Sequence, residues 1–366
     1  FSRSLQTLSV ILSVLFLALG LEMLRYFWTH LKNAPMLRHG VFARGALRPS
    51  LGYVPIQGIP WWGLLVSGLM LATWPGVVIH SVRVGNDLLL YALMAGSMLF
   101  GLRWWREHDS RCFFVALLLA TLGLWTKTNA IVLFGLFGIL LAARLYMRGW
   151  RCVYKQTMMY LGVSAVAGLL VFGPAILKNL EGHSTNLFVG NVGSLNKGLL
   201  VGNNAQNYLF FDHRDYFTEA YASPWGDKGG RQYFVNYFLK TSLTGEFSYS
   251  RQVSSDLAIL LGWLLLAILA IGAWVVWKEV LACPEMQFLA LLAFLMLAAA
   301  LWNRISFPYS CSNDFRYSLP MVIPMIAFFS RSLWLLRHKG RKISLFACGL
   351  LAVLFAVLGS WFIFAL

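Results

Sequence analysis

The stretch Trp74-Pro75-Gly76-Val77-Val78-Ile79-His80-Ser81-Val82-Arg83-Val84-Gly85-Asn86-Asp87 connects two apolar segments, residues 62–82 and 88–104, that both have the character of membrane spans. Polar residues gather at the end of this stretch, between His80 and Asp87. A carboxylate at the edge of hydrocarbon is energetically costly, so such an acid usually has a partner or a functional role. The stretch therefore predicts a membrane protein with a small polar site, centred on Asp87, at one membrane face.

The composition of the whole chain agrees with a membrane protein. Of its 366 residues, 59% are hydrophobic and only 12% are charged, and the mean hydropathy is +0.67. Ten apolar stretches are long enough, or nearly so, to cross about 30 Å of hydrocarbon. They are residues 5–28, 62–82, 88–104, 111–127, 129–147, 157–177, 255–277, 286–304, 317–336 and 343–365. We therefore expect an all-α polytopic membrane protein with about ten spans and one large external loop.

The positive charges predict the orientation of these spans. The formal net charge of +16 is compatible with nucleic-acid binding, but its distribution argues against that function. Eighteen basic residues follow the odd-numbered spans, whereas the short connections on the other side carry only Arg83, Lys127, Arg304 and Arg316. The eighteen are Arg25, Lys32, Arg38, Arg44, Arg48, Arg103, Arg106, Arg111, Arg144, Arg148, Arg151, Lys155, Lys278, Arg331, Arg337, Lys339, Arg341 and Lys342. The positive-inside rule places them in the cytoplasm and Asp87 on the outside.

This orientation divides the chain into three regions. Residues 1–177 form an N-terminal transmembrane half that includes the cytoplasmic loop 29–61, which is either a membrane-hugging loop or a plain linker. Residues 178–254 form the external loop, and residues 255–366 form the C-terminal half. Because the first span is entered from the outside at Phe1, we expect an odd number of spans upstream, or a cleaved signal peptide.

The external loop carries two features of interest. Its middle is rich in amides, among them Asn203 and Asn204, which suit hydroxyl-bearing ligands. Its end carries aromatic residues at positions 233, 234, 237 and 238, which at helical spacing predict an interfacial helix lying against the lipid headgroups. Its acids could include a catalytic base, although each one singly is more often a solvated surface charge: Glu181, Asp212, Asp215, Glu219, Asp227 and Glu246.

Two further cations are expected at the same membrane face as Asp87. Lys127 lies in the short turn after the fourth span, and Arg316 lies beside Tyr317 at the mouth of the ninth. A guanidinium can bind a phosphate through two hydrogen bonds. Snorkelling of long basic side chains to the interface would explain either residue equally well. Taken together with Asp87, they predict one shared site that has an acid and two phosphate-binding cations.

Several of these segments resemble those of the bacterial GT-C glycosyltransferases, the relatives of protein O-mannosyltransferases and of the lipid A aminoarabinose transferase. The segment from Ser4 to Leu15 resembles their second span. Their third span typically ends in a proline, a polar stretch and an aspartate, which Pro75, Ser81, Arg83 and Asp87 match. Two shorter motifs also match in order and sidedness: Leu122-Gly123-Leu124-Trp125-Thr126-Lys127, and Arg316-Tyr317-x-x-Pro320.

The resemblance implies a hexosyl- or pentosyltransferase of the bacterial inner membrane. Such an enzyme takes a sugar from a polyprenyl-phosphate carrier and transfers it to a protein, lipid or glycan acceptor at the periplasmic face. The resemblance assigns Asp87 to the second acidic position, which organises the site. The candidates for binding the donor phosphate are Lys127, Arg316, Tyr317 and Arg83. Asn86 joins Asn203 and Asn204 as a candidate for contacting sugar or acceptor. The family's main catalytic acid lies in the first external loop, which we expect to precede Phe1.

The sequence predicts no cofactor. None of the five cysteines has the spacing of a metal site, and the pair Asn86-Asp87 stands where a DxD metal motif would be. Two other functions remain open. A transporter or flippase for a lipid-linked glycan would have charged residues along a pathway through its spans, and its sequence would contain internal repeats. No repeat is visible in this sequence. A non-catalytic scaffold would leave the clustering of Asp87, Lys127 and Arg316 unexplained.

Overall fold

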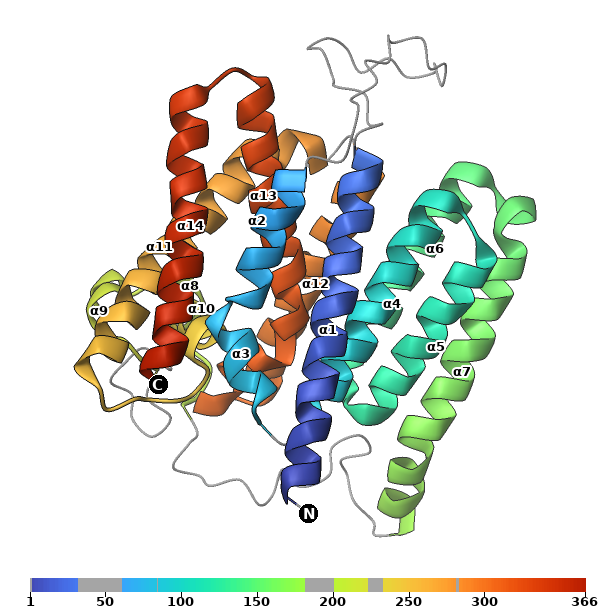
Figure 1. Ribbon diagram of the computed structural model, residues 1–366. Coiled ribbons are helices and arrows are strands. Elements are labelled where there is room, and N and C mark those ends of the chain that lie inside the picture. Colours follow the sequence, from blue (N-terminus) through green and yellow to red (C-terminus); the bar gives the residue numbers. More distant parts are fainter. Residues whose placement is uncertain (1, 32–60, 84, 182–200, 223–232, 281–282) are drawn as a thin grey trace.

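The computed structural model describes residues 2–31, 61–83, 85–181, 201–222, 233–280 and 283–366 (Figure 1). Within these ranges the chain forms helices and no strand. The helices are α1 (Ser2–Leu31), α2 (Trp61–Ala72), α3 (Pro75–Ser81), α4 (Asp87–Glu107), α5 (Ser110–Thr126), η1 (Thr128–Ala130), α6 (Ile131–Arg148), α7 (Trp150–Glu181), α8 (Gln206–Leu209), α9 (His213–Thr218), α10 (Phe234–Thr244), α11 (Gln252–Val280), α12 (Pro284–Ser306), η4 (Ser310–Asn313), η5 (Phe315–Met321), α13 (Val322–His338) and α14 (Lys342–Ala365). Most of the predicted cytoplasmic loop 29–61 lies outside the described residues, as do parts of the external loop.

Each of the ten apolar stretches lies in a helix or in two consecutive helices. Eight of these are long and apolar enough to cross a membrane, and α2 with α3 forms a ninth if the bent pair is one span. The tenth, α5, has 17 residues. At 1.5 Å per residue it is about 25 Å long, slightly less than the hydrocarbon thickness of about 30 Å. The protein is an all-α, multi-pass membrane protein.

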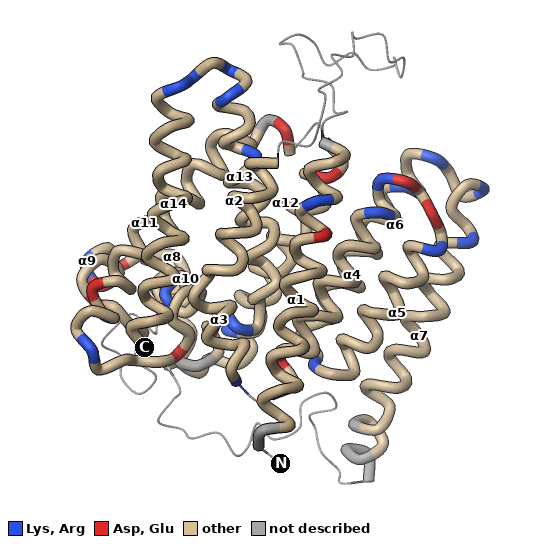
Figure 2. The backbone as a smooth tube through the Cα atoms, in the orientation of Figure 1, with Lys and Arg blue, Asp and Glu red and all other residues tan. Residues whose placement is uncertain are grey.

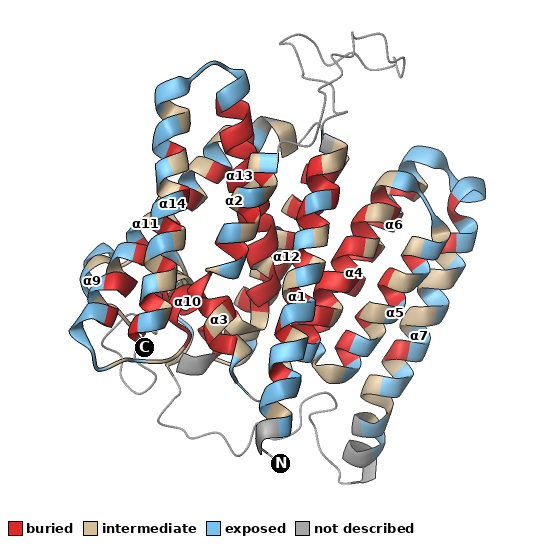
Figure 3. Ribbon diagram, viewed as in Figure 1, coloured by how far each residue is buried: buried red, intermediate tan, exposed pale blue. Residues whose placement is uncertain are grey.

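The centre of the bundle is formed by α4 and α13. In the most apolar part of α4, 78% of the residues are buried, and in that of the segment Phe315–His338, which contains α13, the share is 89%. The corresponding share is 6% for α7, which lies at the periphery (Figure 3). Helix α4 packs against α1 and α5, and α13 packs against α11, α14 and α2. Helix α12 contacts α4, α6, η5 and α13 and so connects the two groups. Peripheral helices instead present large apolar side chains outward, as a lipid solvent favours.

Charged residues separate toward the two ends of the bundle (Figure 2). Eleven lysines and arginines of the described residues lie near the turns α4–α5, α6–α7 and α13–α14, which we call the basic end. The opposite end, which we call the site end, holds α3, the start of α4, the end of α5 and the small helices of the external loop. The separation follows the charge pattern of the sequence.

The predicted span 62–82 is bent. Helices α2 and α3 meet at an angle of 51° around Thr73 and Trp74. Pro75 begins α3, a position where its missing N–H leaves no intrahelical hydrogen bond unmade. The Trp74 Nε1 donates to the carbonyl of Ser242 on α10 at 2.8 Å. The bend thus places α3 against α10 at the site end.

The predicted helix exists as α10, but its aromatic residues do not form a stripe at the membrane surface. Its aromatic residues Phe234, Tyr237 and Phe238 are all buried inside the protein. Helix α10 packs against α3, η5 and α11, and the Phe238 ring meets that of Phe315 edge-on with centroids 4.8 Å apart. The expectation that these aromatics lie on lipid headgroups was wrong, because periodicity cannot distinguish burial against lipid from burial against other helices.

Candidate functional site

The polar residues of the connection after α3 meet the end of α5 and the start of η5 at the site end. Asp87 opens α4, and the Nζ of Lys127, the residue after α5, forms an ion pair with its carboxylate. About a quarter of each side chain is exposed (23% for Asp87 and 24% for Lys127). The Lys127 Nζ also lies 4.8 Å from the ring centroid of Tyr317, a cation–π distance. The structure therefore brings the predicted acid and one predicted cation into direct contact.

Hydrogen bonds from side chains to backbone carbonyls hold these segments together. Asn86 Nδ2 donates to the carbonyl of Thr126 at 3.1 Å, which ties the start of α4 to the end of α5. Asn129 Nδ2 donates to the carbonyl of Tyr317 at 3.2 Å, and the Tyr91 hydroxyl donates to the carbonyl of Arg316 at 2.7 Å. Since Tyr91 lies one turn into α4, these contacts lock η5 against the helix that carries Asp87.

Arg316 lies beside this ion pair and has two partners of its own. Its Nη2 donates to the Tyr317 hydroxyl at 2.8 Å, and its Nε lies 2.9 Å from Asp314 Oδ2. Asp314 also caps η5 by accepting from the Arg316 backbone N–H at 3.0 Å. Tyr317 thus lies between the two predicted cations, within cation–π distance of both. Of the Arg316 side chain, 19% is exposed.

Two further residues belong to this cluster: His80, which the sequence places in the polar stretch before Asp87, and Asp314, which was not singled out from the sequence. His80, at the end of α3, is buried, and its Nε2 has no hydrogen-bond partner among the described residues. Its nearest charged neighbours include Arg83, Asp87, Lys127 and Arg316, so it lies among the charges of the site. Asp314 is likewise buried and close to the carboxylate of Glu246. The sequence signal for Asp314 was its place two residues before Arg316, and Glu246 was one of six acids in the external loop.

The remaining predicted site residues lie differently. Arg83 is exposed, with its guanidinium carbon 5.2 Å from the ring centroid of Phe247. Asn203 joins a second polar group: it accepts from Arg304 Nη1 at 3.1 Å and donates to the carbonyl of Ile305 at 2.8 Å. These contacts attach the external loop to the end of α12 and not to Asp87. Asn204 is exposed and contributes its carbonyl to the turn that begins α8.

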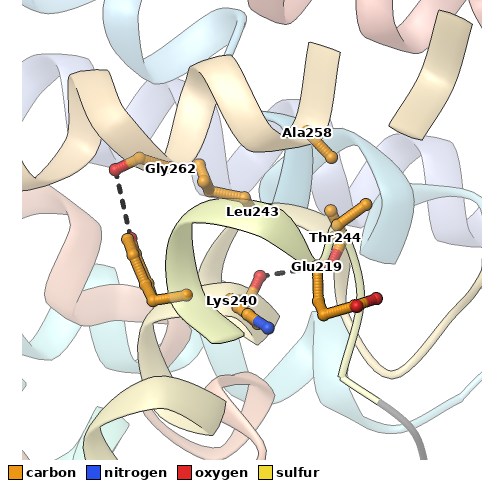
Figure 4. A pocket seen from close by; sticks show the side chains of 8 residues that line it. Glu219, Lys240, Leu243, Thr244, Ala258 and Gly262 are labelled. Carbon is orange, nitrogen blue, oxygen red and sulfur yellow. Dashed lines mark hydrogen bonds between the residues drawn. The ribbon is translucent and has the colours of Figure 1, made fainter. Parts of the chain in front are cut away.

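A small cavity between α9, α10 and α11 is separate from this cluster, and Figure 4 shows the residues that line it. It is lined by Tyr216, Glu219, Ala220, Lys240, Leu243, Thr244, Ala258 and Gly262, and its volume is about 10 Å³. That is room for about one water molecule. Lys240 donates to Asp215 Oδ2 at 2.8 Å, and burial lowers the pKa of the ammonium. The cavity is too small for a sugar, so we assign the Lys240–Asp215 pair to holding α9 on α10.

Asp314 predicts a pH dependence of stability. Burial raises its pKa to about 7, with a further contribution from Glu246, while Arg316 opposes the shift. Because the folded protein holds this proton more tightly than the unfolded chain, the stabilisation is complete below about pH 4 and is lost as the pH rises to about 7. We expect the thermal unfolding temperature to fall over this range. The Asp314→Asn variant, measured at the same pH values, should lose this part of the fall.

We compared the chain with known proteins. None of the protein-family models matches it, and the comparisons with curated proteins and with solved structures return no match. Among the described residues, no group of three or more His, Cys, Asp or Glu side chains is placed to hold a metal ion. Membership of the GT-C glycosyltransferases therefore stays a prediction from short motifs, and the chemistry of the site must be argued from its geometry.

Proposed function

We propose that this protein is a membrane glycosyltransferase of the GT-C type, which moves a sugar from a polyprenyl-phosphate carrier to an acceptor. The observation that carries the proposal is the contact of Asp87 with Lys127 beside Tyr317 and Arg316 at one end of an apolar bundle. Two cations fixed a short distance apart, each partly exposed, make a site suited to a phosphate at the membrane surface. The apolar helices around them would accommodate the carrier's hydrocarbon tail.

The roles of the residues follow from the charge that develops during transfer. An acceptor hydroxyl or amine forms a bond to the anomeric carbon and gives up its proton to a base, while the bond from that carbon to the phosphate oxygen breaks and its electron pair leaves with the phosphate. Cations positioned beforehand stabilise that charge without rearranging. We assign this role to Lys127 and Arg316, with Arg83 at the rim. Asp87 holds the Lys127 ammonium in place, and Tyr317 holds both cations through its ring and hydroxyl.

The arrangement of charge favours transfer over transport of the lipid-linked sugar. In the described helices long enough to span a membrane, three buried charged side chains lie toward helix ends: Arg144 near the end of α6, Glu285 at the start of α12 and Arg304 at its end. A fourth, Arg331, lies seven residues before the end of α13 and forms an ion pair with Glu279 near the end of α11, at the basic end. A transport pathway would need polar groups through the middle of the bundle. We infer that the basic end faces the cytoplasm of a bacterial inner membrane and that the site end faces the periplasm.

The proposal is tested by the fate of the bond between sugar and phosphate. Membranes containing the full-length protein are incubated with polyprenyl-phosphate-linked monosaccharides, and free polyprenyl phosphate is measured together with sugar on any acceptor. A glycosyltransferase releases the free carrier. A flippase would move the lipid-linked sugar across the membrane with that bond intact, and this result would contradict the proposal.

Carrier binding gives a second test that does not depend on the acceptor. In the purified protein, Arg316→Ala is expected to weaken the binding of polyprenyl phosphate by about 2 kcal/mol, roughly thirtyfold, because a charged hydrogen-bond partner of the phosphate is lost. Arg214→Ala is the matched control, since Arg214 is an exposed arginine of the external loop on α9. Equal affinity of the Arg316 variant and the unmodified protein would make Arg316 an ordinary anchor of η5.

A further inference from the structure

One face of α2 is open to the surroundings of the bundle. The helix lies between α1 and α14 and contacts both (Figure 1). Its outward face forms a shallow apolar furrow with a volume of about 470 Å³. The furrow, which we call the α2 furrow, is lined by Trp61, Leu64, Leu65, Gly68, Leu69 and Ala72. Gly68 borders α1, because a Cβ placed there would lie 3.1 Å from the side chain of Leu21.

The dimensions of the α2 furrow match one lipid leaflet. Its twelve-residue helix, at 1.5 Å per residue, is about 18 Å long. Half of a hydrocarbon core of about 30 Å is about 15 Å. The furrow begins at Trp61, near the basic end, and ends at Ala72, next to the bend between α2 and α3. It is therefore open along the leaflet at the basic end and stops near the middle of the bundle.

Cations gather beside the entrance of this furrow. The turn between α13 and α14 carries Arg337, Lys339, Arg341 and Lys342, all exposed, and none forms an ion pair within the described part of the chain. The guanidinium carbon of Arg337 lies 5.5 Å from the ring centroid of Trp62, the second residue of α2, which places the turn at the start of the furrow. Exposed Ile343 and Phe346 follow directly on α14, as expected of a segment at a membrane surface.

We propose that the α2 furrow and the α13–α14 turn together form a binding site for one anionic phospholipid. An acyl chain lies along the furrow, and the phosphate lies among the four cations of the turn. Charge complementarity selects the occupant, because the exposed turn has four positive charges and no acid. Basic segments beside a span attract anionic lipids in this way. The site does not depend on the proposed glycosyl transfer, whose phosphate would bind at the opposite end of the bundle.

The charge part of the proposal is tested by lipid binding to delipidated protein in an uncharged detergent. Native mass spectrometry measures the binding of dioleoyl phosphatidylglycerol and of dioleoyl phosphatidylcholine, which share their chains. We expect the anionic lipid to bind about tenfold more tightly. The double variant Arg341→Gln/Lys342→Gln should lose most of this preference. The control Arg151→Gln/Lys155→Gln removes two exposed cations of the same end, on α7 and away from the furrow, and should keep it.

The position of the acyl chain is tested by a substitution that fills the α2 furrow. Ala72→Phe places a ring at its lower end and should weaken the binding of dioleoyl phosphatidylglycerol while leaving the short-chain dihexanoyl lipid unaffected. Unfolding temperatures of the lipid-free variants show whether each one is folded. Equal binding of the two dioleoyl lipids, or equal losses in the turn variant and its control, would overturn the proposal whatever the furrow variant does.

Discussion

The Asp87→Asn variant of the full chain is expected to transfer sugar at least about a hundredfold more slowly than the unmodified protein, with normal expression. Asparagine has nearly the shape of aspartate but lacks the charge that holds the Lys127 ammonium. Without that partner, Lys127 is free to leave its place over the Tyr317 ring, and the leaving phosphate loses a fixed cation. The measurement is the rate at which free polyprenyl phosphate is released in membranes with equal amounts of either protein.

The loss should lie in the rate and not in carrier binding. Removing a negative charge beside two cations does not weaken their attraction for a phosphate, so the affinity for polyprenyl phosphate should stay equal or increase. Asp109→Asn is the control, because Asp109 also stands at a helix start, where its side chain accepts from the Arg111 N–H, but at the basic end. Asparagine caps helices as well as aspartate does. Turnover like that of the unmodified protein would remove Asp87 from the site.

The sequence predicted the helices because hydrocarbon imposes a strong constraint. A span of about 20 apolar residues must satisfy its backbone internally, so length and hydropathy alone locate it. The same reasoning could not find the bend at Thr73 and Trp74. That bend depends on the Trp74 hydrogen bond to Ser242, a residue 168 positions away. Pro75 was visible in the sequence, but a proline inside an apolar stretch is compatible with a straight span that begins later.

The residues of the candidate site could be predicted in the short connections between spans, where charged residues are rare, but not in the external loop, where they are common. Asp87, Lys127 and Arg316 stood out because each lies in or beside a short connection between apolar segments, and the structure brings them around Tyr317. Asn203 was chosen because the middle of the external loop is rich in amides, but in the structure its side chain accepts a hydrogen bond from Arg304. No pattern in the external loop distinguishes its acids, so the closeness of Glu246 to Asp314 could be seen only once α10 was packed against η5.

The substitution Gly76→Ala is expected to destabilise the protein by about 3 kcal/mol, because it separates two helices that touch through their backbones. A Cβ at Gly76 would overlap the carbonyl oxygen of Ser242 on α10, and a backbone atom cannot turn aside as a side chain can. Helix α3 would have to move away from α10, weakening the hydrogen bond from Trp74 to Ser242. The measurement is the thermal unfolding temperature of the purified variant in detergent.

The same displacement connects the fold to the site. Helix α3 ends at Ser81, so moving it shifts His80 and Arg83 relative to Asp87 and Arg316, which belong to other helices. Carrier binding should therefore weaken together with stability in Gly76→Ala. Gly85→Ala is the matched control: Gly85 lies in the same connection, and no atom lies within 4 Å of a Cβ placed there. Should both variants unfold at the temperature of the unmodified protein, α3 would not be held by its contact with α10, and the position of His80 among the site's charges would need another cause.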